Sequence, residues 1–407
     1  MDSRCVLRLA LRNYKSVEQC DIELAPIVLL VGRNGVGKSN IIDSLRFVTD
    51  ATRNTLEYAI RERGGIDQVR RKSLGGRPTH PGIALELQLP QGRRAKYEFR
   101  IAAVQGRGFR VDHESCEVRG SDGSPEHAYR VDDGKVAEWT PKPTAPPVAH
   151  DRLYLVAASG LPEFRPVYDV LTRMTFHNLN PEVMKSPQRP EPGALLAHDG
   201  RNLASVIKQL ESASPESLER VQHYLKAIGV PISRMRHKQA GALETFEVSM
   251  EWAVREGSRN SNFDAFALSD GTIRALGILI SLVSAQAGGS SGPSLVGIEE
   301  PETALHPAAA GALMEGLTEG AASTQLMITC HSPDLLDHEG VTPEMIRPVI
   351  LDNGRTVVGR LSPAKAELLK QHLSTAGELL RLDQLEPDPE DVARQRDAKG
   401  TLWEGVA

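Results

Sequence analysis

The chain has 407 residues, of which 40% are apolar and 25% are charged, so it can bury one large or two medium hydrophobic cores and is not disordered along its whole length. Its formal net charge of −5 excludes a global basic field that would draw it to DNA or to anionic membranes. Any contact with nucleic acid must therefore be local.

Cysteine usage and hydropathy indicate a cytoplasmic protein. Four cysteines are scattered along the chain, without a CxxC pair or a histidine cluster at ligand spacing, which favours neither a zinc site nor a disulfide framework. No apolar run of about 18 residues occurs, and the first strand-like segment starts almost at Met1 without an apolar leader. We therefore expect no membrane span, no membrane partner and no standard export signal.

The first predicted elements are two half-buried strands, a buried strand and a helix. Alternating apolar residues predict strands over residues 7–12 and 20–24. The continuous apolar run Ile27–Val31 is typical of a strand that is covered on both faces in a parallel sheet. Apolar residues at helical spacing then predict an amphipathic helix, namely Ile41, Ile42, Leu45 and Val48.

The middle of the chain starts with a predicted antiparallel meander over residues 83–139, where short alternating segments are separated by Gly, Pro and Asp turns. A proline-rich stretch follows, and residues 153–156 resemble a further strand. Residues 165–228 are predicted to be mainly helical.

Basic residues gather near the start of this meander. Residues 61–77 contain no aromatic side chain for base stacking, so a solvated charged face is the simpler interpretation and a local nucleic-acid contact is the alternative. The basic residues are Arg61, Arg63, Arg70, Arg71, Lys72, Arg77, Arg93, Arg94, Lys96 and Arg100.

The last part of the chain is predicted to alternate strands and helices. Strands are expected over residues 244–254, 294–298 and 325–329, with a helix over 308–317 and a short helix after Leu361. No heptad pattern persists, so coiled-coil arms are not expected. The expected organisation is an N-terminal lobe at 1–150, a mainly helical insert at 151–260, a C-terminal lobe at 261–360 and an acidic, partly disordered tail at 361–407.

Residues 32–39, GRNGVGKS, match the phosphate-binding pattern G-x-x-x-x-G-K-[ST] and lie between the predicted buried strand and helix; we call them the P-loop. Its glycines let backbone N–H groups approach the β-phosphate, while Lys38 would bridge the β- and γ-phosphates and Ser39 would bind Mg²⁺. A glycine turn without a nucleotide is the alternative. The predicted nucleotide-binding residues here are Gly32, Arg33, Asn34, Gly35, Val36, Gly37, Lys38, Ser39 and Asn40.

Two carboxylates end the predicted strand at 294–298. Glu299 would hold the metal, directly or through water, and Glu300 would act as general base on the attacking water. Adjacent acids are more often a solvated strand end, but the P-loop favours the catalytic interpretation. His331 follows the next predicted strand, and a histidine at that end of the sheet points toward the γ-phosphate, with a structural role as the alternative.

Residues 268–272, LSDGT, precede a long apolar helix. Alone, Ser269 or Asp270 is simply a helix N-cap. Beside the other motifs, the segment resembles an ABC signature, and we call residues 268–272 the signature. The resemblance implies a half-site in which the Ser269 hydroxyl, the Gly271 backbone and the helix N-terminus would meet the γ-phosphate of ATP held by a second protomer.

The segments LRNYKS, the P-loop, LSDG, IEEPETALHP and TCHSPDLLD occur in this order and resemble the RecF/SMC/OLD-like branch of ABC-type ATPases, in particular its short, arm-less AAA-type members. The resemblance implies an α/β P-loop NTPase of the ABC-ATPase head type, with a mixed central sheet, an antiparallel β lobe and an inserted helical subdomain. It also implies hydrolysis of ATP to ADP and phosphate with Mg²⁺. The expected assembly is an ATP-dependent homodimer, with ATP between the P-loop of one subunit and Ser269 and Gly271 of the other.

The same resemblance implies roles for three further segments, on less specific motifs. Residues 303–307 would form the loop that crosses the dimer interface, and Gln68 and Gln88 are both candidates for the Q-loop glutamine. The family segment that wraps the nucleotide corresponds to Arg12, Asn13, Lys15 and Ser16, which a strand turn explains equally well.

Two residues depart from the family pattern. Glu299 replaces the more usual Asp and should still bind magnesium. Asp270 replaces a Gly in the signature and adds a negative charge near the γ-phosphate.

Three functions are compatible with such an ATPase. The first is a regulatory motor or switch in DNA repair or in defence against phages and mobile elements, acting with a separate effector such as a nuclease or toxin. The second is the nucleotide-binding subunit of an ABC transporter, against which the opening hairpin and the long interval between the P-loop and Glu299 favour the RecF-like branch. The third is the ATPase of an OLD-type nuclease; residues 332–407 contain no D-x-D motif, so a Toprim domain is not expected.

Overall fold

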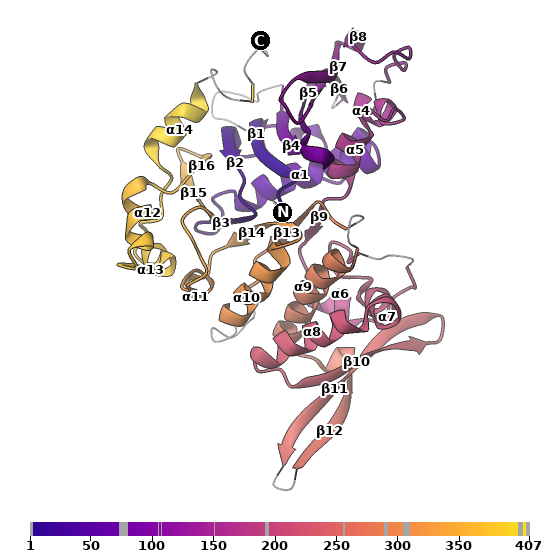
Figure 1. The fold of residues 1–407 in the computed structure, drawn as a ribbon, viewed down its shortest axis with the longest axis vertical. Coiled ribbons are helices and arrows are strands. Elements are labelled where there is room, and N and C mark those ends of the chain that lie inside the picture. Colours follow the sequence, from indigo (N-terminus) through magenta and orange to yellow (C-terminus); the bar gives the residue numbers. More distant parts are fainter. Residues whose placement is uncertain are drawn as a thin grey trace. The chain divides into compact units, whose positions relative to one another are not determined.

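The computed structural model describes residues 3–72, 80–104, 106, 108–149, 151–191, 195–254, 257–288, 292–303, 310–397 and 402–403. The chain divides into two compact units, each built from separated segments (Figure 1). Unit 1 comprises residues 1–174, 343–367 and 385–407, and unit 2 comprises residues 175–342 and 368–384.

Unit 1 contains a mixed sheet with the strand order β8-β7-β6-β5-β4-β1-β2-β16-β15-β3. The strands from β8 to β2 pair antiparallel, whereas β16 pairs parallel with β2 and β15 pairs parallel with β3. The strands are β1 (Val6–Tyr14), β2 (Val17–Glu23), β3 (Ile27–Val31), β4 (Gly82–Gln88), β5 (Arg94–Val104), β6 (Gly108–Arg119), β7 (Pro125–Asp132), β8 (Lys135–Trp139), β15 (Ile346–Asp352) and β16 (Arg355–Val358).

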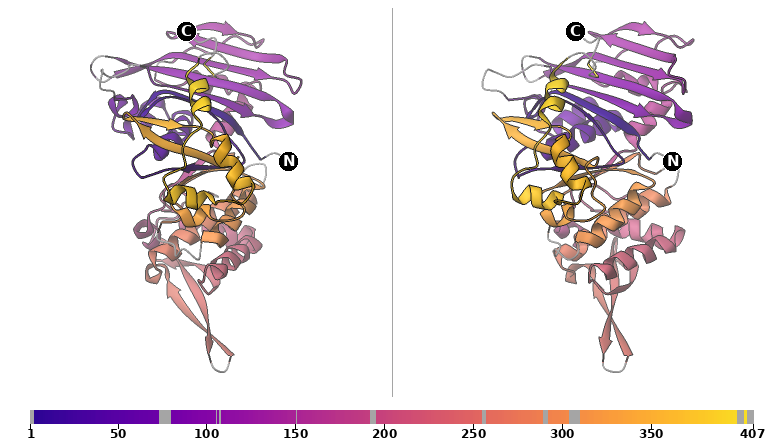
Figure 2. Two further views of the ribbon diagram at one scale, coloured as in Figure 1. Left: turned by 90° about the vertical axis from the view of Figure 1, so that its left-hand side faces the viewer. Right: turned by 60° about the vertical axis from the view of Figure 1, so that its left-hand side comes forward.

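The predicted hairpin, buried strand and meander are confirmed, and Figure 2 shows the meander strands side by side. All five residues of β3 are buried, as a strand covered on both faces requires. Strands β15 and β16 were not predicted, because the short segment that contains them has neither a clear alternation nor a motif. They nevertheless provide the two parallel pairings of this sheet described above, β15 with β3 and β16 with β2.

Helix α1 (Lys38–Arg53) has the predicted amphipathic face, with Ile41, Leu45 and Val48 buried. Its Phe47 ring packs edge-on against Tyr14 at 5.9 Å and stacks with Phe99 at 6.3 Å. Aromatic packing therefore joins the helix to β1 and to the meander. The shorter helices of unit 1 are α2 (Leu56–Arg61), α3 (Ile66–Val69), α4 (Tyr154–Ala158), α5 (Arg165–Thr172) and α14 (Pro389–Arg396).

The strand expected at residues 153–156 is wrong, because this segment forms α4. Its start is fixed by Glu114 of β6, whose buried carboxylate accepts the backbone N–H groups of Tyr154 (2.6 Å) and Leu155 (2.8 Å). A carboxylate at a helix N-terminus satisfies free N–H groups and favours helix. The hydroxyls of Tyr97 and Tyr129 also donate to Glu114.

One short helix was predicted after Leu361, whereas the described residues of this segment form three, namely α12 (Pro363–Lys370), α13 (Ala376–Arg381) of unit 2, and α14. Helix α14 packs on β2, where Gln395 accepts a hydrogen bond from the backbone of Asp21 at 3.0 Å. Acidic residues help to cap two of these helices, because Asp388 is the N-cap of α14 and Glu378 completes the capping box of Thr375 at α13.

Unit 2 has a parallel sheet of β14 (Gln325–Cys330), β13 (Leu295–Glu299) and β9 (Thr175–His177), and a second sheet of β10 (Ile232–Ala240), β11 (Leu243–Val254) and β12 (Gly257–Asp264). The strands predicted at 244–254, 294–298 and 325–329 are confirmed. Strand β12 was missed because it is almost entirely polar. The remaining helices are α6 (Pro181–Lys185), α7 (Leu203–Ala213), α8 (Pro215–Ala227), α9 (Asp270–Ala287), α10 (Ala310–Ala321) and α11 (Pro333–Leu336).

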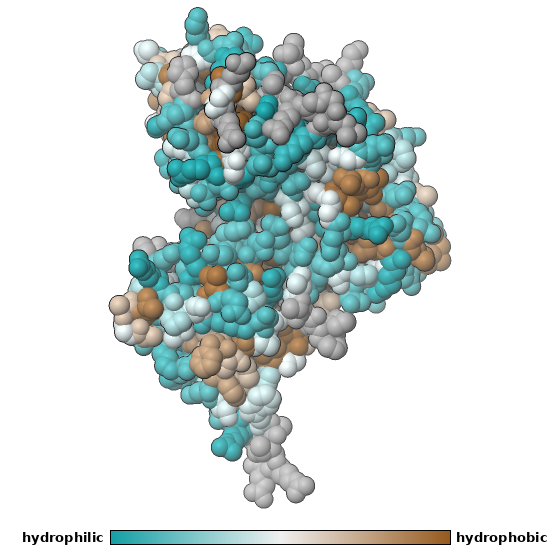
Figure 3. All heavy atoms as spheres, turned by 180° about the vertical axis from the view of Figure 1, so that it is seen from behind, coloured by the Kyte–Doolittle hydropathy of each residue, from teal (hydrophilic) through white to brown (hydrophobic). Residues whose placement is uncertain are grey.

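The mixed sheet and its helices confirm the predicted α/β class. Within the ranges described above, no helix is long and apolar enough to cross a membrane. On the face drawn in Figure 3, hydrophilic residues predominate and apolar residues form separate patches, which is ordinary for an exposed surface.

We expect Glu114→Gln to lower the free energy of unfolding by about 2 kcal/mol, because the amide nitrogen of glutamine cannot accept a hydrogen bond from these buried donors. Urea unfolding followed by circular dichroism measures the effect. Glu117→Gln, on the same strand at a partly exposed position, is the matched control and should change the value by no more than about 0.5 kcal/mol. Equal losses in the two variants would contradict this role for Glu114.

Candidate functional site

The P-loop connects β3 to α1 and approaches the β15–β16 hairpin too closely for side chains at two positions. A Cβ atom on Gly32 would lie under 3.0 Å from the carbonyl oxygen of Val349. Gly37 has a φ of 102° and precedes the first residue of α1, and a Cβ atom there would meet the hydroxyl of Thr356. Glycine at these two positions therefore lets the loop pack tightly on the hairpin, while residues 33–35 of the loop stay exposed, where a phosphate group could approach their backbone.

Lys38 supplies the positive charge of this cradle. Its side chain is almost fully buried, and its ammonium donates to the carbonyl oxygens of Gly32 (2.6 Å) and Arg33 (2.9 Å). Ser39 follows in the first turn of α1 and is exposed. A fixed cation beside the N-terminus of a helix favours an anionic ligand, and a neighbouring hydroxyl suits Mg²⁺.

Three hydroxyl and amide groups support the loop from outside. Thr356 of β16 donates from Oγ1 to the carbonyl oxygen of Val36 at 2.7 Å, and its Oγ1 lies 2.7 Å from Ser16 Oγ. Asn40 then donates from Nδ2 to Ser16 Oγ at 2.6 Å. The structure thus joins Ser16 and Asn40 to the P-loop, and it adds Thr356, for which the sequence carries no signal.

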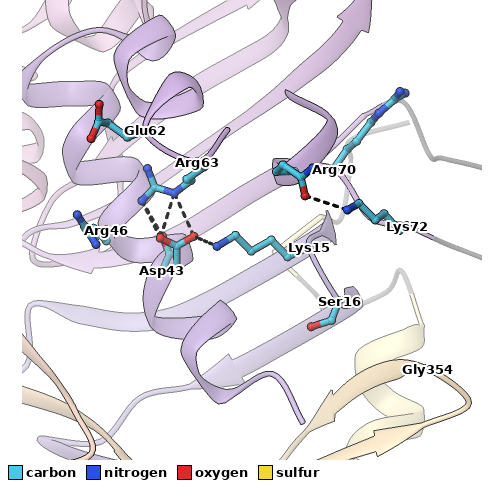
Figure 4. Close-up of a pocket in the computed structure, with 10 residues that line it drawn as sticks. Lys15, Ser16, Asp43, Arg46, Glu62, Arg63, Arg70, Lys72 and Gly354 are labelled. Carbon is cyan, nitrogen blue, oxygen red and sulfur yellow. Dashed lines mark hydrogen bonds and ion pairs between the residues drawn. The ribbon is translucent and has the colours of Figure 1, made fainter. Parts of the chain in front are cut away.

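Beside this network lies a polar pocket of 610 Å³. In Figure 4, Lys15 and Arg63 both point at Asp43 of α1, with closest contacts of 2.5 Å and 2.8 Å. Burial raises the pKa of Asp43, but the charges of Arg63 and then Lys15 outweigh it and lower that pKa to about 2. The pocket is lined by Lys15, Ser16, Asp43, Arg46, Glu62, Arg63, Gln68, Arg70, Lys72 and Gly354.

The two Q-loop candidates occupy different places in unit 1. Gln68 lines the pocket next to the P-loop support and accepts a hydrogen bond from Lys72 at 2.8 Å. Gln88 instead donates to the carbonyl oxygens of Leu89 and Arg93 and braces a turn of the meander. Gln68 is therefore the better candidate of the two.

The acidic half-site lies in unit 2, at the carboxyl ends of β13 and β14. Glu299 is the last residue of β13 and pairs with Thr329. Glu300 has a φ of 46°, which a residue other than glycine adopts only at a cost of about 1–3 kcal/mol. Its backbone N–H is held by the carbonyl oxygen (3.2 Å) and the hydroxyl (3.1 Å) of Thr329. Glu300 therefore lies in a turn with positive φ directly after the end of β13.

His331 follows β14, as predicted, and lies near Glu300. Its Nδ1 atom lies 3.8 Å from Glu300 Oε1 and 3.4 Å from Glu302 Oε1. Glu302 also accepts the backbone N–H of His331 at 2.8 Å. Sequence reasoning gave Glu302 no role of its own, although it lies within the quoted IEEPE segment.

The signature segment lies at the exposed start of α9, also in unit 2. Ser269 is the N-cap and accepts the backbone N–H of Thr272 at 3.2 Å, which confirms the capping role. The side chain of Asp270 is 57% exposed and forms an ion pair with Lys185 of α6. Gly271 follows within the first turn of the helix.

Each half-site is thus built within one unit. Unit 1 contains the P-loop residues with Ser16, Asn40 and Thr356, and unit 2 contains Glu299, Glu300, His331 and the signature residues. Arg77 and residues 304–307 of the expected interface loop lie outside the described residues. Among the residues that are described, no group of three or more His, Cys, Asp or Glu side chains could hold a metal ion unaided.

We expect Asp43→Asn to destabilise the protein by about 2 kcal/mol at pH 7 and by much less near pH 2. The folded pKa of Asp43 lies below its unfolded value of about 3.9, so its contribution is complete above about pH 5 and is lost as the pH falls toward 2. Urea unfolding at several pH values measures this difference. Asp67→Asn, at a more exposed ion pair, is the control, and a pH-independent loss in Asp43→Asn would contradict the assignment.

Comparison with solved structures finds SMC head domains at low sequence identity. The SMC head bound to the C-winged helix domain of ScpA has 13% identity and a TM-score of 0.49, with 89% of this chain and 99% of that chain covered. The SMC head domain from Thermotoga maritima has 14% identity and a TM-score of 0.41, with coverages of 88% and 99%. The Smc head with an extended coiled coil, bound to the C-terminal domain of ScpA derived from Pyrococcus furiosus, has 12% identity and a TM-score of 0.48, with coverages of 91% and 99%.

The comparison with curated proteins gives no match. One family profile, described as "AAA domain, putative AbiEii toxin, Type IV TA system", matches residues 27–337. The matched region is well over half of the chain and includes the P-loop, the signature, the acidic strand and His331. The chain therefore belongs to this AAA-domain family.

Proposed function

We propose that the protein hydrolyses ATP to ADP and phosphate and acts as an ATP-dependent dimeric switch in DNA repair or in defence against phages and mobile elements. A separate effector, such as a nuclease or toxin, would carry out the downstream reaction. The observation that carries the proposal is the strained Glu300 beside His331 in a chain that also has a complete glycine cradle around Lys38.

The proposed roles follow from the chemistry of each group. Lys38 and the P-loop backbone would bind the phosphates, and Ser39 and Glu299 would hold Mg²⁺, which supplies positive charge to the phosphate oxygens. Glu300 is 40% exposed, so its carboxylate can reach solvent and take the proton of the attacking water. His331 would hydrogen-bond at the same reaction centre.

The pocket beside the P-loop supports the proposed wrapping role of Lys15 and Ser16. Ser16 bonds to both Thr356 and Asn40 and also lines the 610 Å³ pocket. A nucleotide with its phosphates on the loop would place its ribose or base against this pocket. The mixture of charged and amide groups there suits the polar edges of a nucleoside.

The signature residues support a dimer in which each ATP is completed by a second copy of the chain. Ser269 and Asp270 lie at the exposed start of α9, where a ligand held by another subunit can reach them. The negative charge of Asp270, a departure from the family pattern, is balanced by the ammonium of Lys185. We therefore propose that Lys185 allows the signature to accept a phosphate despite this carboxylate.

The biological setting rests on family membership. The description of the matched family names a type IV toxin–antitoxin system, which supports a role in defence with a partner protein. An ATPase whose two copies associate only around ATP is suited to signalling to such a partner, because dimer formation changes the exposed surface.

Glu300→Gln should bind ATP with unchanged affinity but lose turnover by about a hundredfold or more, because the general base is removed. The same variant should form a stable dimer with ATP, measured by size exclusion with light scattering, and Lys38→Ala should fail to bind ATP at all. Glu315→Gln, at an exposed position of α10, is the matched control. Wild-type turnover per subunit that does not depend on protein concentration would contradict the dimer, and full turnover in Glu300→Gln would contradict the base.

Lys185→Ala should weaken the ATP-dependent dimer of the Glu300→Gln variant by about tenfold, which is about 1.4 kcal/mol, because Asp270 then faces the phosphate unpaired. Adding Asp270→Gly should restore the affinity. Lys226→Ala, at an exposed lysine on α8, is the control. Unchanged dimerisation in Lys185→Ala, or no rescue by Asp270→Gly, would argue against this role of the pair.

A further inference from the structure

Glu302 differs from its neighbour Glu300 in burial. Its side chain is 7% exposed, whereas that of Glu300 is 40% exposed. Glu302 Oε1 accepts the backbone N–H groups of His331 (2.8 Å) and Ser332 (3.2 Å). The carboxylate therefore ties the loop after β13 to the turn that carries His331 and leads into α11.

Two buried polar atoms of this cluster have no hydrogen-bond partner among the described residues. They are Glu302 Oε2 and His331 Nδ1. Leaving such an atom unpaired costs about 1–3 kcal/mol, so the cluster gains stability from any adjustment that pairs one of them. His331 Nδ1 already lies 3.4 Å from Glu302 Oε1, so a small rotation of the imidazole ring is enough to align a hydrogen bond.

The chemistry of the two groups decides which way that hydrogen bond runs. An ionised carboxylate only accepts hydrogen bonds, and a neutral imidazole carries its proton on either Nδ1 or Nε2. The carboxylates of Glu302 and Glu300 both face Nδ1. They favour the proton on Nδ1 and leave the lone pair on Nε2.

We propose that Glu302 is the positioning residue of His331: it fixes the turn that carries the histidine and holds the imidazole in the Nδ1–H tautomer, so that Nε2 is an acceptor at the reaction centre. The tautomer follows from this cluster alone, and its catalytic consequence rests on the proposed ATPase function. The orienting role resembles that of the carboxylate in a catalytic triad, which holds a histidine in one tautomer through Nδ1.

The Glu302→Gln variant distinguishes the selection of the His331 tautomer from a purely structural role, in which Glu302 only holds the turn. Glutamine has nearly the same size and keeps one oxygen to accept the two backbone N–H groups, so the turn is retained. It removes the nearer of the two negative charges that favour the Nδ1–H tautomer. If Glu302 only held the turn through its hydrogen bonds to the backbone, the variant would leave the tautomer of His331 unchanged.

The direct test is a long-range ¹H–¹⁵N spectrum of the full chain with ¹⁵N-labelled histidine at about pH 8, above the ordinary histidine pKa of about 6.5. His331 is assigned by the signals that disappear in His331→Gln. We expect the Nδ1–H pattern in the wild type, a shift toward the Nε2–H pattern in Glu302→Gln, and no change in Glu339→Gln, the exposed control. An Nε2–H pattern in the wild type, or an unchanged tautomer in folded Glu302→Gln, would overturn the proposal.

Turnover gives the second readout. Glu302→Gln should lower kcat by about tenfold or more and leave the KM for ATP little changed, because the residue acts on the histidine and not on ATP binding. An unchanged kcat would overturn the catalytic part of the inference. If the wild type does not hydrolyse ATP, the proposed function fails, and the tautomer measurement still decides the role of Glu302.

Discussion

Gly37 has no room for a side chain because the hydroxyls of Ser16 and Thr356 occupy the space beside it. Ser16 and Thr356 are 340 positions apart in the sequence, yet their oxygens are 2.7 Å apart, and Thr356 also donates to the loop carbonyl of Val36. The left-handed backbone at Gly37 and the start of α1 depend on this contact. The phosphate cradle is thus formed jointly by both ends of the chain, even though its motif is contiguous.

The acidic half-site has a comparable dependence on a few close contacts. Thr329 holds the backbone N–H of Glu300 in a strained turn, and Glu302 holds the backbone of His331. The strain is compatible with folding because the buried strand β13 leads into the turn and Thr329 of the neighbouring buried strand β14 holds it. A carboxylate and an imidazole are thereby presented together at the ends of two parallel strands, where ligands of α/β sheets usually bind.

Much of this could be predicted from the sequence, because the relevant patterns are local. The P-loop, the amphipathic α1 and the meander each follow from residues close in sequence, and the positions of Glu300 and His331 after predicted strands follow from the apolar runs that precede them. The roles of all the proposed site residues remain predictions, as do the domain boundaries.

What sequence reasoning missed depends on contacts between distant residues. Residues 153–156 form a helix because Glu114, about forty positions earlier, caps its first amides. Thr356 supports the P-loop from a strand that has no motif, and Lys185 balances Asp270 from a helix 85 positions away. No local pattern marks any of these partners.

The central claim is that one ATP is bound by the P-loop of one subunit and the signature of another. A crystal structure of Glu300→Gln with Mg²⁺ and ATP tests it most directly. The account predicts a symmetric dimer in which the γ-phosphate contacts Lys38 of one protomer and Ser269 and Gly271 of its partner. An ATP-bound monomer whose Ser269 and Gly271 contact only solvent would contradict it.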